Sequence, residues 1–172
     1  AFLEENHFNN LKNRLLKDAP IESIDIKKSY PKKVSYKNIL TKEDLKNFIR
    51  KVHETGTLSI DTETDTLKAI DAKLIGVSLS YKIGSACYIP ISHINNEAIT
   101  QLKLDSIISL LNPLLSDNSI LKIGQNIKYD LIVLKKNGFN FIYPCDDTML
   151  MSYTLSAGLH HHNLDFLAKF YL

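Results

Sequence analysis

The sequence predicts an α/β fold in which one mixed β-sheet is flanked by helices. Three apolar runs of strand length occur between residues 57 and 91. Apolar residues then recur at helical spacing, and a further short apolar run at 119–123 leads directly into a second helical pattern at 126–137. A strand reached through a helix usually lies parallel to its neighbour, so we expect antiparallel strands first and a parallel strand later.

The antiparallel part of the sheet is predicted from the three apolar runs. The strands are expected near residues 57–63, 73–81 and 84–91, and the turn Lys82-Ile-Gly84 joins the last two as a hairpin. A helix should precede them, because Thr41 can cap free backbone amides and Asp44 can reach back towards it; this helix is expected to end near residue 52.

The later helices follow from apolar spacing and from stop signals. One apolar stripe predicts a core helix, although Pro113 can bend it; the stripe consists of Leu104, Ile107, Ile108, Leu111, Leu114 and Leu115. Gly138 is expected to stop the helix at 126–137, and two more helices are expected near 147–157 and 163–171.

Acidic residues follow two of the predicted strands. Asp61 and Glu63 are two positions apart at the end of a strand, so their side chains project from the same face while Leu58 and Ile60 face the core. Asp130 lies at the start of the helix that follows the later strand. An Asp-x-Glu pair alone is common, and Asp130 alone could be an ordinary solvated residue. Carboxylates crowded at one sheet edge repel one another unless a cation neutralises them, so together they predict a site for a hard divalent cation.

These residues resemble the motifs of a known family. Asp61-Thr-Glu63 resembles the first motif of the 3′–5′ exonucleases of the Asp-Glu-Asp-Asp group, which have a ribonuclease H-like fold. The segment Gln125-Asn126-Ile-Lys-Tyr129-Asp130 resembles their second motif, in the form typical of the proofreading domain of bacterial DNA polymerase I (family A). The resemblance extends to further segments at 74–80, 86–93, 147–153 and 164–168.

The resemblance implies a chemistry and a set of site residues. The family hydrolyses DNA 3′ ends to nucleoside 5′-monophosphates with two Mg²⁺ or Mn²⁺ ions. The metal ligands implied here are Asp61, Glu63 and Asp130. The positions that match contacts to a single-stranded 3′ end are Thr64, Leu67, Gln125, Asn126 and Tyr129. By the same resemblance Asp146 and Asp147 stay outside the metal set, since one of them caps a helix in the family, and His161 stands roughly where relatives carry an Arg that contacts DNA.

The resemblance also implies a domain organisation. Residues 1–35 resemble the tail of a 5′ nuclease domain followed by a linker, with an amphipathic helix expected over about residues 2–16, and residues 36–172 resemble the exonuclease domain. Primer-template DNA and covalently linked polymerase and 5′ nuclease domains are the implied partners. The family completes its site with a third motif, Tyr-x-x-x-Asp, which has no match here, so we expect it beyond Leu172 and expect the site of this chain to be incomplete.

Two other functions are compatible with the same residues. A ribonuclease D-like enzyme would use the same metal chemistry to trim RNA from its 3′ end, and only the 2′-hydroxyl distinguishes the substrates. Alternatively, the domain could be a catalytically inactive scaffold of a polymerase. The presence of Asp61, Glu63 and Asp130 argues against the scaffold.

Composition adds context. The formal net charge is only +2, which argues against tight nonspecific duplex binding. Cys87 and Cys145 are far apart and make no disulfide framework, and the sequence shows no membrane-spanning run or signal peptide, so a cytoplasmic location without membrane partners is expected. The run His160-His161-His162 could suggest zinc or an affinity tag, but it is internal and lacks paired ligand spacing.

Overall fold

The computed structural model of the chain describes residues 2–6, 8, 34–94 and 101–172. They belong to two compact units, one formed by Pro31–Thr148 and the other by Ala1–Tyr30 together with Met149–Leu172. The predicted linker and most of the predicted helix over residues 2–16 lie outside the described residues, and within that helix only the short α1 (Phe2–Glu5) is described.

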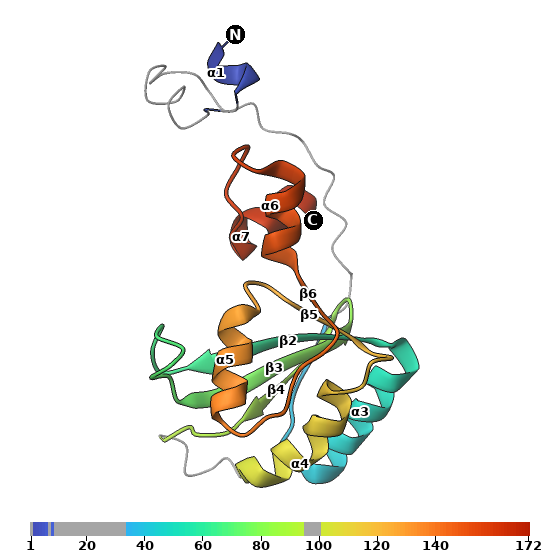
Figure 1. The fold of residues 1–172 in the computed structure, drawn as a ribbon. Helices are drawn as coiled ribbons and strands as arrows, with labels where there is room; N and C mark the ends of the chain where they lie inside the picture. The colour runs from blue at the N-terminus through green and yellow to red at the C-terminus, as the bar shows by residue number, and fades with distance from the viewer. Residues whose placement is uncertain (1, 7, 9–33, 95–100) are drawn as a thin grey trace. The chain divides into compact units, whose positions relative to one another are not determined.

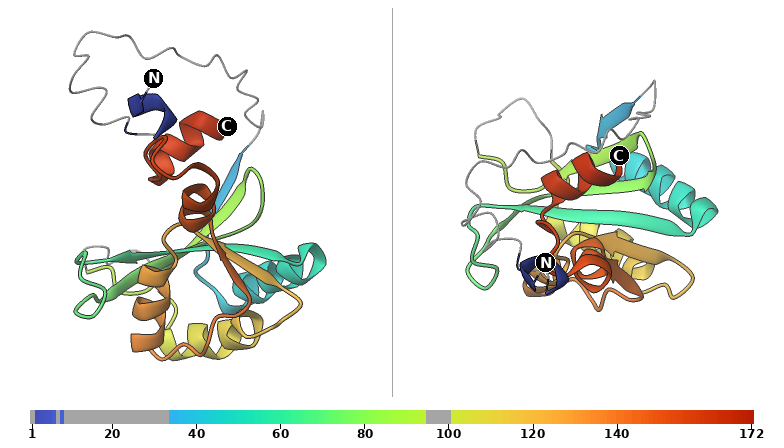
Figure 2. Two further views of the ribbon diagram at one scale, coloured as in Figure 1. Left: turned by 45° about the horizontal axis from the view of Figure 1, so that its top comes forward. Right: turned by 90° about the horizontal axis from the view of Figure 1, so that it is seen from above.

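A six-stranded mixed sheet forms the centre of the unit Pro31–Thr148, in the order β1-β4-β3-β2-β5-β6 (Figure 1). β2 pairs with β3, and β3 with β4, in antiparallel fashion; β1 with β4, β2 with β5, and β5 with β6 are parallel. The views in Figure 2 show that the sheet twists, as right-handed strands require. The strands are β1 (Ser35–Asn38), β2 (Thr57–Thr64), β3 (Leu74–Lys82), β4 (Ser85–Pro90), β5 (Leu121–Gly124) and β6 (Cys145–Asp147).

The mixed sheet confirms the predicted fold class, but two edge strands were not predicted. β1 is exposed at all four positions and therefore shows no apolar alternation. β6 has only three residues, Cys-Asp-Asp, a composition that does not favour strands. Both strands exist because each finds a parallel partner, β4 for β1 and β5 for β6. Tertiary pairing, rather than local sequence, forms them.

Helices α3 (Lys42–Thr55) and α5 (Lys128–Lys136) pack onto this sheet, and α4 (Leu104–Leu115) packs against α3. Thr41 caps α3 as predicted: its hydroxyl oxygen accepts the amide of Asp44 at 3.1 Å and its hydroxyl donates to the Asp44 carboxylate at 2.7 Å. α3 continues to Thr55, beyond the predicted end, because Gly56 in the left-handed conformation supplies the stop. α4 contains Pro113 in its last turn without ending there, and its buried stripe faces the core as predicted.

The second unit contains α7 (Leu164–Tyr171) and all of α6 (Thr148–Ser156) except its first residue, and both helices are close to their predicted bounds. Two of the three consecutive histidines take part in its packing. His162 is buried, with its Nδ1 2.7 Å from the Ser152 hydroxyl and its ring against Tyr153. His160 stacks on Phe166. These imidazoles thus act as aromatic core groups. In the part of the chain that the structure describes, no helix is both long enough and apolar enough to cross a membrane.

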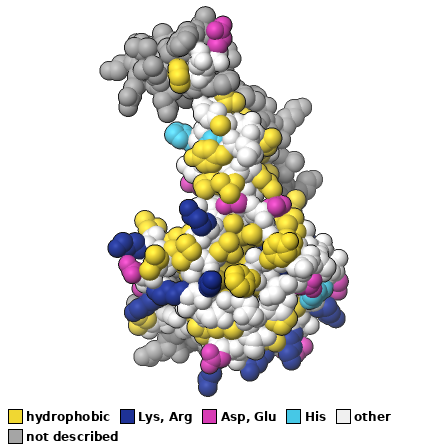
Figure 3. Space-filling view, viewed as in Figure 1, with side chains coloured by type: hydrophobic (Ala, Val, Ile, Leu, Met, Phe, Trp, Pro, Cys, Tyr) yellow, Lys and Arg dark blue, Asp and Glu magenta, His cyan; other side chains and the backbone are white. Residues whose placement is uncertain are grey.

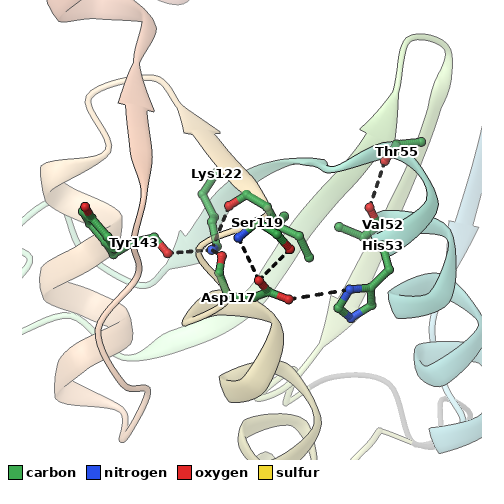
Figure 4. A network of polar contacts seen from close by, with 8 residues as sticks. Val52, His53, Thr55, Asp117, Ser119, Lys122 and Tyr143 are labelled. Carbon is green, nitrogen blue, oxygen red and sulfur yellow. Dashed lines mark hydrogen bonds and ion pairs between the residues drawn. The ribbon is translucent and has the colours of Figure 1, made fainter.

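A buried lysine connects the segments that lead into β5 and β6 (Figure 4). Lys122 is fully buried, and its ammonium donates to the backbone carbonyls of Asp117 at 2.6 Å, Ile120 at 2.9 Å and Tyr143 at 2.8 Å. Burial lowers the pKa of Lys122, and the charge of Asp117 opposes this shift. All three ammonium protons have an acceptor, so the charge is solvated by the protein backbone in place of water.

Replacing Lys122 by Met should destabilise the fold by about 3 kcal/mol, because three buried carbonyls lose their donor. Urea unfolding of Lys122→Met, followed by circular dichroism, measures the loss. The matched control is Lys46→Met, since Lys46 is exposed on α3. Equal stability of the two variants would contradict this structural role for Lys122.

Candidate active site

Strand β2 places the first two predicted carboxylates on one face of the sheet. Leu58, Ile60 and Thr62 alternate into the core, whereas Asp61 and Glu63 project from the opposite, exposed face. This is the predicted alternation, and it follows from the two-residue period of a strand. A bulge between Glu63 and Thr64 then ends the regular pairing with β3 and turns the chain into the segment 64–67.

Helix α5 brings Asp130 to the point where β2 and β5 part. The pairing of these strands ends at Ser59 and Ile123, so the following residues of β2 have no partner strand on that side. Asp130 takes this place: its Oδ1 accepts the Thr62 amide at 2.8 Å and the Thr62 hydroxyl at 2.6 Å. Asp130 is only 3% exposed. A side chain from the second motif therefore completes the hydrogen bonding of the strand that carries the first motif.

The start of α5 is fixed by β6. Asp147 accepts the backbone amides of Asn126 and Ile127, both at 3.0 Å, and so caps a helix that has no local side-chain cap. Asn126 adopts a left-handed conformation, with φ of 55°, to make this turn. Gly124 precedes it because a Cβ there would lie 2.8 Å from the Ile127 side chain.

The segment after β2 is held from the second motif as well. The Tyr129 hydroxyl lies 2.6 Å from the Thr64 hydroxyl and donates to the Thr66 carbonyl at 2.6 Å. Leu67 follows at the tip and is 95% exposed. An isolated leucine so exposed makes no contribution to the core, and it is available to contact a ligand.

These elements enclose a pocket of about 530 Å³. All eight predicted site residues line it: Asp61, Glu63, Thr64, Leu67, Gln125, Asn126, Tyr129 and Asp130. Thr62, Asp65 and Thr66 line it too and were not predicted. The sequence gives one signal for Thr62: it lies between two acids on a strand, so its side chain points to the buried face. That position does not predict its hydrogen bonds to Asp130.

Burial and neighbouring charge raise the pKa of two carboxylates in this pocket, Asp61 and Asp130. Burial raises the pKa of Asp61 to about 6, with further contributions from the charges of Asp130 and Glu63. Burial also raises the pKa of Asp130, although the two bonds from Thr62 oppose the shift. Among the described residues, no ion pair neutralises Asp61, Glu63 or Asp130. The site concentrates negative charge that the protein itself does not balance.

Comparison with known proteins identifies the family. Residues 36–172 match the family described as 3′-5′ exonuclease. The chain belongs to this 3′–5′ exonuclease family. DNA polymerase I of Borreliella burgdorferi is 41% identical over 141 residues, which cover 81% of this chain and 15% of that protein. DNA polymerase I of Pseudomonas aeruginosa is 33% identical over 176 residues, covering 100% of this chain and 19% of that protein.

The exonuclease domain is therefore of the DNA polymerase I type, as the motifs predicted, and it spans about a fifth or less of these curated relatives. Solved structures share its fold. Escherichia coli RNase D matches with a TM-score of 0.62 and 17% identity, over 80% of this chain and 34% of that chain. Brucella melitensis NrnC with bound Mg²⁺ matches with a TM-score of 0.54 and 22% identity, over 81% and 61%. The predicted ribonuclease H-like exonuclease fold is thereby confirmed.

Exonucleases of this fold use divalent metal ions. Within the described ranges, no three His, Cys, Asp or Glu side chains are grouped closely enough to form a ready-made metal centre. The chemistry of the exonuclease pocket nevertheless fits such ions. Its acidic donors are all carboxylate oxygens, which hard divalent cations prefer, and the charges of Asp130 and Glu63 add to the burial that raises the pKa of Asp61.

The raised pKa of Asp61 predicts a pH-dependent cost to stability. A carboxyl group whose pKa rises from 3.8 to about 6 on folding binds its proton more tightly in the folded exonuclease domain, so stability falls as the pH rises through this interval. Asp61→Asn should therefore stabilise the metal-free domain at pH 7.5 by about 1 kcal/mol, a value reduced for solvent screening of an exposed side chain.

Urea unfolding in EDTA at several pH values tests this, and the gain should shrink as the pH approaches the ordinary carboxyl range. Asp105→Asn, an exposed acid on α4, is the control. A gain for Asp61→Asn that does not change with pH would rule out the electrostatic explanation.

The adjacent acids Asp146 and Asp147 of β6 should differ in how much they contribute to the stability of the domain. Asp147→Ala should cost about 1 kcal/mol, because it removes the acceptor for two amides at the start of α5. Asp146→Ala should leave stability unchanged within error. Thermal unfolding of both variants in EDTA provides the comparison, and an equal loss in the two would contradict the capping role of Asp147.

Proposed function

We propose that this domain removes nucleotides from the 3′ end of single-stranded DNA by metal-dependent hydrolysis that releases nucleoside 5′-monophosphates. The observation that carries the proposal is the convergence of both sequence motifs on one pocket. Three carboxylates that form no ion pair with any described residue line it, together with an exposed leucine. Membership of the 3′–5′ exonuclease family supports it, as does the name DNA polymerase I of the curated relatives.

Asp61, Glu63 and Asp130 would hold two Mg²⁺ or Mn²⁺ ions. Asp61 would bind both, Glu63 the one nearer the attacking water and Asp130 the other. When bound, such ions activate water and stabilise the charge of the leaving 3′ oxygen. Asp130 would bind through Oδ2, because its Oδ1 already accepts two bonds from Thr62. The anchoring by Thr62 limits the rotation of this carboxylate and so presents Oδ2 in a fixed direction.

The remaining pocket residues would position the strand end. Leu67, with its side chain in solvent, would pack against a terminal base in a contact that tolerates any sequence. Thr64, Gln125 and Asn126 line the same pocket, and they would present polar groups to the strand end. Tyr129 would act through its ring and by holding the segment 64–66, since its hydroxyl is engaged with Thr64 and Thr66.

The relatives also support a wider proposal. We propose that the chain acts within a longer cytoplasmic protein that also carries polymerase and 5′ nuclease domains and binds primer-template DNA. The third motif with its additional ligand would follow Leu172. The charge distribution is compatible with contact to a strand end: on the face shown in Figure 3, Lys and Arg side chains are interspersed with acidic ones and form no continuous basic surface.

Removing a metal ligand should abolish cleavage. In a version of the chain extended through the third motif, Asp61→Ala and Asp130→Ala should each lower the rate of nucleotide release from 3′-labelled single-stranded DNA by at least about 100-fold, because metal ions contribute several kcal/mol to the stabilisation of the transition state. Asp105→Asn is the matched control, and EDTA should abolish activity in every variant.

The assay also separates the alternatives. If a matched RNA is cleaved in preference to DNA, the domain is a ribonuclease D-like enzyme and the DNA exonuclease assignment is wrong. No cleavage of either substrate by the extended protein, with Mg²⁺ or with Mn²⁺, would identify the domain as a scaffold.

A further inference from the structure

One face of the sheet connects the carboxylates of β2 to a tyrosine on β4. Glu63 is paired with Gly76 of β3, and Asp61 is paired with Ser78, which in turn is paired with Tyr88 of β4. Residues directly opposite on neighbouring strands project from the same face. Tyr88 therefore stands on the face that carries Asp61 and Glu63, separated from them only by β3.

Gly76 allows the Tyr88 ring to lie across β3. A Cβ at Gly76 would be 2.0 Å from the Tyr88 hydroxyl oxygen and 2.2 Å from the ring carbon that bears it, so any side chain there would displace the ring. The hydroxyl thus lies over the backbone of the residue that pairs with Glu63. Burial raises the pKa of Tyr88, and the charge of Glu63 adds to the shift, as expected for a phenol close to a carboxylate.

His93 holds this hydroxyl from the other side. Its Nε2 lies 2.8 Å from the Tyr88 oxygen, and the two rings meet edge to face at 82°. The His93 backbone is itself fixed by Gln101, which accepts its amide at 3.0 Å and donates to its carbonyl at 2.9 Å. When Nε2 donates to the phenol oxygen, the single hydroxyl proton is free to be donated to an acceptor on the other side.

Glu63 is the strong acceptor near that proton. In the described part of the chain it makes no hydrogen bond or ion pair, so its carboxylate is not oriented by any other group. Carboxylates that bind metal ions are usually oriented by a further hydrogen bond, and loss of that bond typically costs affinity. Tyr88 does not line the pocket itself, so it can act on the ligand without contacting the substrate.

We propose that Tyr88 is a positioning residue for Glu63: its hydroxyl, oriented by His93, donates to the Glu63 carboxylate when that carboxylate binds a divalent ion. Tyr88 acts through Glu63 and not on the DNA. The inference rests on the proposed function, since it requires Glu63 to be a metal ligand.

Mn²⁺ binding to the chain extended through the third motif, measured by electron paramagnetic resonance, tests the proposal without relying on cleavage. Tyr88→Phe keeps the ring over Gly76 and removes only the hydroxyl, so it should weaken Mn²⁺ binding about 10-fold while the unfolding midpoint in EDTA stays the same. His93→Ala should weaken binding in the same direction. Tyr81→Phe is the control, because Tyr81 on β3 packs against Phe48 and does not line the pocket of the carboxylates.

Asp61→Asn, titrated with Mn²⁺ in the same experiment, distinguishes failure of the role of Tyr88 from failure of the metal site. If Asp61→Asn abolishes binding and Tyr88→Phe binds like the unmodified chain, the role of Tyr88 is overturned and the metal site stands. If Tyr88→Phe instead lowers the unfolding midpoint in EDTA as its main effect, the residue is structural and the proposal is again overturned. If the extended chain without substitutions binds no Mn²⁺, the metal site and the role of Tyr88 are both overturned.

Discussion

The site depends on the pair of hydrogen bonds between Thr62 and Asp130. These residues are 68 positions apart in the sequence, and their contact joins β2 to α5 where β5 no longer pairs with β2. An unpaired amide of a central strand would cost as much as a lost hydrogen bond if left buried, so Asp130 satisfies a requirement of the fold. The same contact places Asp130 beside Asp61, where the charge of Asp130 adds to the burial that raises the pKa of Asp61. Structure and chemistry are therefore coupled through one carboxylate: one of its oxygens completes the strand, and the other can serve as a ligand.

The ionised carboxylates of the pocket lower the stability of the folded domain. A domain selected only for stability would place a lysine or arginine among three crowded acids, yet within the described residues none forms an ion pair with them. The chain does provide such compensation elsewhere, because Asp117 accepts bonds from Ser119 and lies near His53, and these interactions lower its pKa. The contrast between Asp117 and Asp61 is what the proposed cation site would explain. The chain stabilises the charge of Asp117 but leaves the charge of the pocket acids without an ion pair among the described residues. Such unfavourable charge is typical of functional sites.

Local patterns predicted the parts of the structure that local forces determine. The alternation in β2, the cap at Thr41 and the apolar stripe of α4 depend on neighbours within one turn or one strand, and all three are present. β1 and β6 could not be predicted, because only pairing with a distant strand makes them extended. Lys122 would be read as a surface residue, since its burial depends on two nearby backbone carbonyls, of Asp117 and Ile120, together with the carbonyl of Tyr143, 21 residues away. For the site, the motifs identified the residues that line the pocket, while Thr62, Asp147 and Tyr88 support those residues from positions that no spacing rule relates to them.

The least regular part of the sheet sets the geometry of the pocket. β6 has three residues and lies at an edge, so it adds little to stability, yet its last residue Asp147 holds the amides of Asn126 and Ile127 and thereby fixes where α5 begins. Asp147 reaches them because it is in register with Gly124, the residue at which the chain turns from strand to helix. A one-residue slip of β6 would leave the core intact but would point this carboxylate to the other face of the sheet. The position of Asp130, which follows Asn126 and Ile127 by four and three residues, would then be lost. The geometry of the site is therefore more easily lost than the fold, because the core rests on many buried apolar contacts and the entry to α5 rests on one edge pairing.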